Sequence, residues 1–287
     1  EIRNDSKKQV TILDLGCPID VVPYPIKTTK EERLNLSLNT DFNFLSVALL
    51  GVRKNLENLV RWFLEEFEHD NVGLILKTSQ GRGSIIDRDN TFKYLKNIID
   101  SKDRKCKVFL LHGDLSEAEL HSLFNNEQIQ AYVTCTHGEG YGLPIFEAAY
   151  SGLPIIATDW SGHLDFLSCE YKQNGKAKNK KLFAKVDYSL EEIPSEAVWE
   201  NILIEGSKWA VPKEHALKRQ MRNVFDKYGM YKKWATALKE SVTTSHTEEA
   251  IFEKMQKSLF PPEILEKLQN TKEDFFWFEE QQIKTYD

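Results

Sequence analysis

The chain has 287 residues, of which 41% are hydrophobic and 29% charged, so it can bury the core of one large domain or two small ones. Its net charge is -6 and its basic residues are scattered among acids, which argues against binding to nucleic acid or to an anionic membrane. No apolar run approaches the roughly 20 residues of a membrane span. We therefore expect a soluble protein.

The cysteines and histidines indicate neither disulfides nor a metal site. The four cysteines, Cys17, Cys106, Cys135 and Cys169, lie far apart, and no histidine cluster has metal-ligand spacing. Reduced thiols in a cytoplasmic protein are the simplest interpretation.

The N-terminal 41 residues differ in character from the rest of the chain. The chain opens on Glu1 rather than Met and continues with a polar stretch, which we interpret as the start of a piece of something longer. Residues 27–41 are polar and are typical of a linker. We assign residues 1–41 to a leading segment and an interdomain linker.

Strands and helices are then predicted to alternate along residues 42–159. Hydrophobic periodicity and a capping box, Ser116 with Glu119, support these assignments. Strands are expected at 42–51, 72–79, 106–113, 131–136 and 154–159, with helices at 54–69, 88–102, 116–126 and 144–152. The buried helix faces are expected to carry Leu56, Leu59, Val60, Phe63, Leu64 and Phe67 in the first helix, and Phe92, Leu95, Ile98 and Ile99 in the second.

Such units predict an α/β fold, a Rossmann-like doubly wound parallel sheet over residues 42–190 with helices on both faces. Ligands of such folds bind outside the carboxyl ends of the strands. Residues 191–287 are predicted to form a helical C-terminal extension. It ends near an apolar cluster, Phe275 to Phe278, for which we expect a partner surface.

A stretch that comes directly after a predicted strand carries the strongest functional signal. "HGEGYGLPIFEAAYSGLPIIATDWSG", residues 137–162, places Glu139 and Glu147 on either side of a glycine-bearing turn that leads into a helix. Amides of residues 141–145 would point out of the helix end toward a phosphate or a sugar oxygen, and Gly140 and Gly142 would allow close approach. Both carboxylates would border one cavity and accept hydrogen bonds from vicinal hydroxyls. The plainer alternative is that Glu147, in the first turn, complements the helix dipole and Glu139 is a solvated loop acid.

This stretch resembles the E-x7-E signature of the retaining GT-B glycosyltransferases (glycosyl transferases group 1). "FLSVALLGVRKNLENLVRWFLEEF", "FLLHGDLSEAELHSLF" and "GSKWAVPKEHALKRQMRNVF" are similar to further segments of that family, in the same order. The resemblance covers roughly residues 20–230 and implies the C-terminal, nucleotide-sugar-binding domain of a GT-B fold. It also implies that no divalent metal or other cofactor is needed, because the donor substrate is a nucleoside-diphosphate sugar.

The resemblance implies roles for individual residues. Glu147 would bind the ribose hydroxyls, Glu139 the hydroxyls of the donor sugar, and Lys54 the diphosphate, where it stabilises charge on the leaving group. The amides of Tyr141, Gly142 and Leu143 would lie beside the sugar and diphosphate. The family's arginine position is Ala48 in this chain, which leaves Arg53, Lys77 or Arg82 as substitutes.

Further residues are expected around the base and the rim of the site. His112, Gly113 and Leu115 would flank the nucleotide base, and Gly162, with Trp160, Ser161 and His163, would face the rim. Lys77 could equally be a solvated strand end, and His112 a packed histidine.

The sequence thus predicts the donor-binding half of a retaining hexosyltransferase, which could be inactive as an isolated fragment. The acceptor, a glycan, lipid or protein, and a missing N-terminal domain would be its other partners. One alternative is a non-catalytic nucleotide-sugar-binding or regulatory module. The other is a dinucleotide-dependent oxidoreductase, against which the lack of a GxGxxG after an early strand argues.

Overall fold

The computed structural model describes residues 2–4, 9–11, 19–27, 29, 30, 32, 34–173, 175–200 and 202–270. The chain forms two compact units, residues 26–244 and residues 1–25 with 245–287. In the second of these units, β1 (Ile2–Asn4) pairs with β2 (Gln9–Thr11), and two helices follow, α7 (Glu248–Leu259) and α8 (Pro262–Asn270). The predicted aromatic cluster at 275–278 lies outside the described residues.

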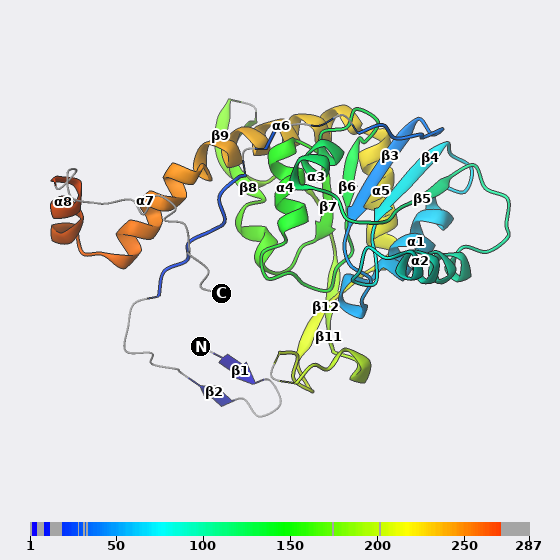
Figure 1. Cartoon of the computed structure of the whole chain (residues 1–287), viewed down its shortest axis with the longest axis horizontal. Coiled ribbons are helices and arrows are strands. Elements are labelled where there is room, and N and C mark those ends of the chain that lie inside the picture. Colours follow the sequence, from blue (N-terminus) through cyan, green and yellow to red (C-terminus); the bar gives the residue numbers. More distant parts are fainter. Residues whose placement is uncertain are drawn as a thin grey trace, which may run out of the picture. The chain divides into compact units, whose positions relative to one another are not determined.

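The unit of residues 26–244 is built on a six-stranded sheet in which every pairing is parallel (Figure 1). The strand order is β10-β7-β6-β3-β4-β5, so the chain starts in the middle of the sheet, builds one half and then crosses over to build the other. The strands are β3 (Phe42–Val47), β4 (Val72–Lys77), β5 (Lys107–Leu111), β6 (Ala131–Val133), β7 (Ile155–Thr158) and β10 (Ala184–Val186).

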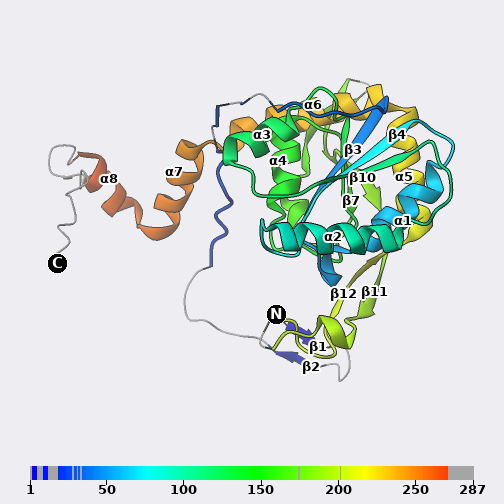
Figure 2. The ribbon, with the colours of Figure 1, turned by 45° about the vertical axis from the view of Figure 1, so that its right-hand side comes forward.

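Helices cover both faces of this sheet, which confirms the doubly wound fold predicted from the sequence (Figure 2). Successive strand residues point to opposite faces, so Phe44 and Leu45 belong to different cores. One face is covered by α1 (Leu56–Glu66), α2 (Ile85–Ile98) and α5 (Glu214–Asp226), and the other by α3 (Glu117–Phe124), α4 (Leu143–Ser151) and α6 (Tyr228–Ser245).

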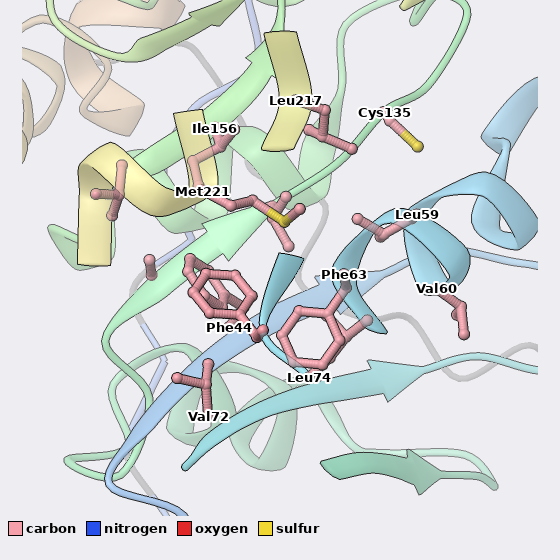
Figure 3. Close-up of a cluster of buried hydrophobic side chains, with 14 of the residues drawn as sticks. Phe44, Leu59, Val60, Phe63, Val72, Leu74, Cys135, Ile156, Leu217 and Met221 are labelled. Atoms are coloured by element: carbon pink, nitrogen blue, oxygen red, sulfur yellow. The ribbon is translucent and has the colours of Figure 1, made fainter. Parts of the chain in front are cut away.

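The core on the α1 side contains all six apolar residues predicted for the first helix, from Leu56 to Phe67. Phe63 of α1 and Met221 of α5 pack around Phe44 and Leu74 of the strands (Figure 3). Each buried apolar side chain of this size contributes about 1.5–3 kcal/mol relative to its exposure. Burial of apolar surface therefore fixes α1 and α5 on this face.

The predicted buried face of α2 is wrong in one position. Phe92 is 57% exposed, and the residues that α2 buries are Asp87, Thr91 and Leu95. The helix also begins earlier than expected, because the Ser84 side chain accepts a hydrogen bond from the Asp87 amide and caps it. The buried face of α2 is thus partly polar, and apolar periodicity could not locate it.

Two hairpins were not predicted. β8 (Ser168–Gln173) pairs with β9 (Lys176–Lys181), and β11 (Tyr188–Glu192) pairs with β12 (Lys208–Pro212). The second hairpin, with the loop that joins its strands, extends away from the main sheet (Figures 1 and 2). We call residues 188–212 the arm; its loop contains a short 3-10 helix, η3 (Ser195–Ala197).

Candidate functional site

A pocket of about 840 Å³ lies where strands β3, β4 and β5 end, at the carboxyl edge of the sheet. Its lining residues follow these strands directly or come from α3, the start of α4 and the arm. They are Val47 to Lys54, Lys77 to Ser79, Asp114, Leu115, Leu120, Pro144, Glu196 to Trp199 and Leu203. The fold therefore places a cavity where open α/β sheets bind their ligands.

Three cationic side chains, those of Arg53, Lys54 and Lys77, line this pocket. Arg53 and Lys54 belong to a 3-10 helix, η1 (Val52–Lys54), that follows β3. Lys77 ends β4, and its Nζ donates a hydrogen bond to the Gly113 carbonyl over 2.6 Å. Burial lowers the pKa of Lys77, against the opposing charge of Asp114. Arg82, the other suggested substitute for the family's arginine, is not among the lining residues and is exposed.

Glu139 is bound by two of these cations. Its carboxylate accepts hydrogen bonds from Lys54 Nζ over 2.6 and 2.8 Å and from Arg53 Nη1 over 3.0 Å. Burial alone would raise the pKa of Glu139, but the hydrogen bonds and charges of Lys54 and Arg53 outweigh it, and the pKa lies below its usual value. The side chain of Glu139 is only 10% exposed, so this residue is not the solvated loop acid of the plainer alternative.

The loop that carries Glu139 is held from the opposite side by residues 161 and 162. The Glu139 amide donates to Ser161 Oγ over 2.7 Å, and the Gly162 amide donates to the Glu139 carbonyl over 3.1 Å. A Cβ at Gly162 would lie 1.8 Å from the Gly140 carbonyl oxygen, so only glycine fits there. Gly162 thus acts through close backbone packing against the loop.

The turn into α4 exposes fewer amides than expected. Gly142 caps the helix in the left-handed conformation, with φ at 87°, and its carbonyl accepts from the amides of Ile145 and Phe146. Among the described residues, none accepts a hydrogen bond from the amides of Gly142 or Leu143. The prediction that the Ile145 amide points out of the helix end is therefore wrong. Tyr141 packs its ring against Phe146 and Phe166.

Glu147 lies in the second turn of α4, so the predicted place in the first turn is wrong and the helix dipole does not account for it. Burial raises its pKa to about 7, and the neighbouring ion pair of Lys27 and Glu117 adds opposing contributions. Its Oε2 is buried and has no hydrogen-bond partner among the described residues. Neither Glu139 nor Glu147 lines the pocket, in contrast to the single cavity that the sequence indicated.

The expected base side of the site is stabilised by a buried pair that the sequence did not reveal. His112 Nε2 lies 2.8 Å from Asp87 Oδ1, and Asp87 also accepts from the amides of Gln80 and Arg82 over 3.0 Å each. The hydrogen bond from His112 lowers the pKa of Asp87 far below its ordinary value. His112 is thus a packed, hydrogen-bonded residue that ties the loop after β4 to the loop after β5. Of the other two residues expected beside the base, Leu115 lines the pocket and Gly113 does not.

The other rim residues lie away from the pocket. His163 is fully buried and its Nε2 bonds the Thr158 carbonyl over 2.8 Å, while Trp160 contacts Tyr188 of the arm. Within the part of the chain that the structure describes, no three His, Cys, Asp or Glu side chains are grouped to hold a metal ion. In that same part, no helix has both the length and the apolar character needed to cross a bilayer.

The fold and site define an α/β protein with a cationic pocket at the carboxyl edge of its parallel sheet. A sequence profile of the family "Glycosyl transferases group 1" matches residues 28–197, more than half of the chain. The chain belongs to this family. No curated protein matches it significantly.

Solved structures of low sequence identity share the fold. Sucrose-phosphate synthase from Thermosynechococcus elongatus is 16% identical, with a TM-score of 0.54 over 87% of this chain and 52% of that one. Anabaena Alr3699/HepE in complex with UDP-glucose is 13% identical, with a TM-score of 0.50 over 77% and 49%. A protein from E. coli, named trehalose-6-phosphate and bound with UDP-2-fluoro glucose, is 11% identical, with a TM-score of 0.50 over 78% and 45%. The chain spans about half the length of these proteins, and its sheet is a Rossmann-like domain of the GT-B fold.

Proposed function

We propose that this chain supplies the donor-binding half of a retaining glycosyltransferase, which transfers a hexose-like sugar from a nucleoside-diphosphate sugar to an acceptor. The observation that carries this proposal is the convergence of Arg53, Lys54 and Lys77 on one pocket at the carboxyl edge of the sheet. Cations at this edge can neutralise a diphosphate. Two of the similar structures hold UDP-sugars, which supports a nucleotide sugar as the donor for this chain.

Donor binding would exchange the partner of Lys54. In the absence of a donor, Glu139 neutralises Lys54 and Arg53. A diphosphate in the pocket would take over these cations and release the Glu139 carboxylate to accept hydrogen bonds from the sugar hydroxyls. The amides of Gly142 and Leu143 would donate to the phosphates or the sugar, and the unpartnered Oε2 of Glu147 would accept from the ribose.

The chemistry proposed for this site is the loss of a phosphate leaving group. Lys54 and Arg53 would stabilise the negative charge that builds up on the departing diphosphate as the glycosidic bond breaks. In a retaining reaction on one face of the sugar, that phosphate can itself take the proton of the acceptor. No side chain of this chain is assigned as a nucleophile.

Isothermal titration with UDP, GDP and ADP tests the donor site. We expect at least one of them to bind in the micromolar to millimolar range, and Lys54→Met to weaken it about tenfold or more because a charge-assisted contact is lost. Lys178→Met, an exposed lysine on β9, is the matched control and should leave the affinity unchanged.

Two results would count against the proposal. An absence of heat with all three nucleotides at high concentration would rule out the donor site. If Glu147→Ala and Lys54→Met both bound the nucleotide as tightly as the unaltered chain, a regulatory module that binds its ligand through other residues would be favoured over a transferase.

A further inference from the structure

The arm, residues 188–212, is a part of the candidate site to which the family match gives no role. The profile match ends at residue 197, so Trp199, Leu203 and strand β12 lie beyond it. The arm displays exposed apolar side chains on its loop, namely Val198, Trp199, Ile202 and Ile204. The arm makes two sets of contacts with the candidate site, one at its root, where β12 meets His137, and one at its tip, the loop that contains η3.

The root of the arm is fixed to the loop that carries Glu139. The rings of Trp209 and His137 stack with centroids 4.2 Å apart and an interplanar angle of 10°. His137 Nδ1 lies 2.7 Å from the Ala210 carbonyl oxygen, and the Ala210 amide donates to the His137 carbonyl over 3.1 Å. His137 also donates its own amide to the Arg53 carbonyl over 2.9 Å. Through His137, these contacts connect β12 to the loop that carries Glu139 and to the backbone of Arg53, one of the residues proposed to bind phosphate.

The tip of the arm reaches the pocket itself. η3 contacts η1, and Ala197, Val198, Trp199 and Leu203 line the pocket together with Leu115 and Leu120 from the region after β5. A loop that projects from the β10 side of the sheet thus supplies one wall of a cavity whose other walls follow β3, β4 and β5. The Trp199 side chain is part of this wall while Trp199 remains 64% exposed.

The chemistry of the pocket walls differs from element to element. Arg53 and Lys54 of η1 and Lys77 at the end of β4 supply cations, where a diphosphate would bind. The arm tip and the region after β5 contribute mainly apolar side chains, with the indole of Trp199 and the acids Glu196 and Asp114 among them. A nucleobase is a flat heterocycle whose faces are stabilised by contact with such side chains. A charged phosphate, by contrast, is not stabilised by contact with an indole ring.

We propose that the tip of the arm covers the nucleoside of the bound donor, with Trp199 as a binding residue that contacts the base. This inference rests on the proposed function, because the occupant is the nucleoside diphosphate of the donor. An exposed indole would become covered when the nucleotide enters, and the arm would thereby set how tightly the chain holds its donor. Because the root of the arm is hydrogen-bonded to His137, the tip can cover the nucleoside without a rearrangement of the main sheet.

Titration of the full chain with the best-binding of UDP, GDP and ADP tests the arm. Trp199→Ala should raise the Kd about tenfold, the size of the effect when an aromatic partner of a base is removed. Trp199→Phe should restore most of the affinity. Ile202→Ala is the matched control, since Ile202 is 59% exposed on the same loop and does not line the pocket.

The outcomes separate this inference from the proposal on which it rests. If the unaltered chain binds a nucleotide and Lys54→Met weakens it, but Trp199→Ala behaves like Ile202→Ala, the donor site stands and the role of the arm is refuted. If no nucleotide binds to the unaltered chain, both fail. Equal weakening by Trp199→Ala and Ile202→Ala would indicate a general disturbance of the arm and would also refute a contact with the base.

Discussion

Glu147 has an environment unlike that of an ordinary surface carboxylate. It lies on α4 with one carboxyl oxygen buried and without a partner among the described residues, and burial raises its pKa to about 7. A protonated carboxyl is cheaper to bury than a charged one, so the folded state holds this proton more tightly than the unfolded chain does. The stabilisation that results is complete below the ordinary pKa of 4.5 and is lost as the pH rises through about 7.

Glu147→Gln should therefore remove the cost of burying an ionised carboxylate, which grows as the pH rises. The free energy of unfolding of this variant should exceed that of the unaltered chain by an amount that grows by about 2 kcal/mol between pH 5 and pH 8. Urea unfolding at both pH values measures the difference. The exposed Glu127→Gln should show no such growth, and a constant difference for Glu147→Gln would contradict the raised pKa.

Only part of the candidate site was predictable residue by residue. Lys54, Arg53, Lys77 and Leu115 were expected through the resemblance to the glycosyltransferase family, and the structure places all four in one pocket. The Asp87–His112 pair was missed because its partners are 25 positions apart and lie on different elements. The contact of Glu139 with Lys54, 85 positions apart, was hidden for the same reason, since a pairing across the sheet leaves no local pattern in the sequence.

At the scale of the element, hydrophobic periodicity predicted the buried face of a helix correctly where that face is apolar. It predicted α1 with all its buried residues, but for α2 it selected Phe92, whereas the helix buries Asp87 and Thr91. β11 was missed because acids occupy its exposed end and because 15 residues separate it from its partner β12, too many for a tight hairpin turn to reveal the pairing. Strand pairing of this kind depends on tertiary contacts rather than on local propensity.

The start of α3 shows what a local signal can establish. Ser116 and Glu119 form a reciprocal capping box, with Glu119 N to Ser116 Oγ at 3.1 Å and Ser116 N to Glu119 Oε2 at 2.8 Å. Ser116→Ala should lower the free energy of unfolding by about 1 kcal/mol, because an orphan amide at the helix start loses its acceptor. Denaturant unfolding beside Ser101→Ala, an exposed serine outside helices and strands, measures the loss. Equal stabilities of the two variants would contradict the cap.

At the scale of the molecule, the class of fold was predictable although the strand order was not. Alternating strands and helices with near-continuous apolar strands predict a parallel sheet covered on both faces, and the structure confirms it. The order β10-β7-β6-β3-β4-β5 and the position of β10 depend on pairings between distant segments. Most of the arm was predicted to belong to a helical extension from residue 191 onward, which is wrong, because β11 and β12 form an antiparallel pair there. The arm nevertheless supplies one wall of the pocket.

A ligand that binds only the folded molecule should stabilise it as a whole. At a free concentration about 100 times the Kd, the best-binding nucleotide should add about 2.7 kcal/mol to the free energy of unfolding, which corresponds to a rise in Tm of about 5–10 °C. Differential scanning calorimetry across a nucleotide titration measures it. The Lys54→Met chain at the same nucleotide concentration should show a smaller rise, and equal shifts for both chains would contradict binding through Lys54.

The strand order also determines when the site can form during folding. β3 and β4 are about 30 positions apart in register and β6 and β7 are 23 apart, but β3 and β6 are 87 apart, the widest separation between paired strands of the main sheet. Closing so long a loop is slower than forming the local units on either side. Lys54 follows β3 and Glu139 follows β6, so the cations and the carboxylate meet only after this last pairing. A nascent chain would therefore gain its ligand-binding capacity at the end of folding, after both halves of the sheet have acquired their own structure.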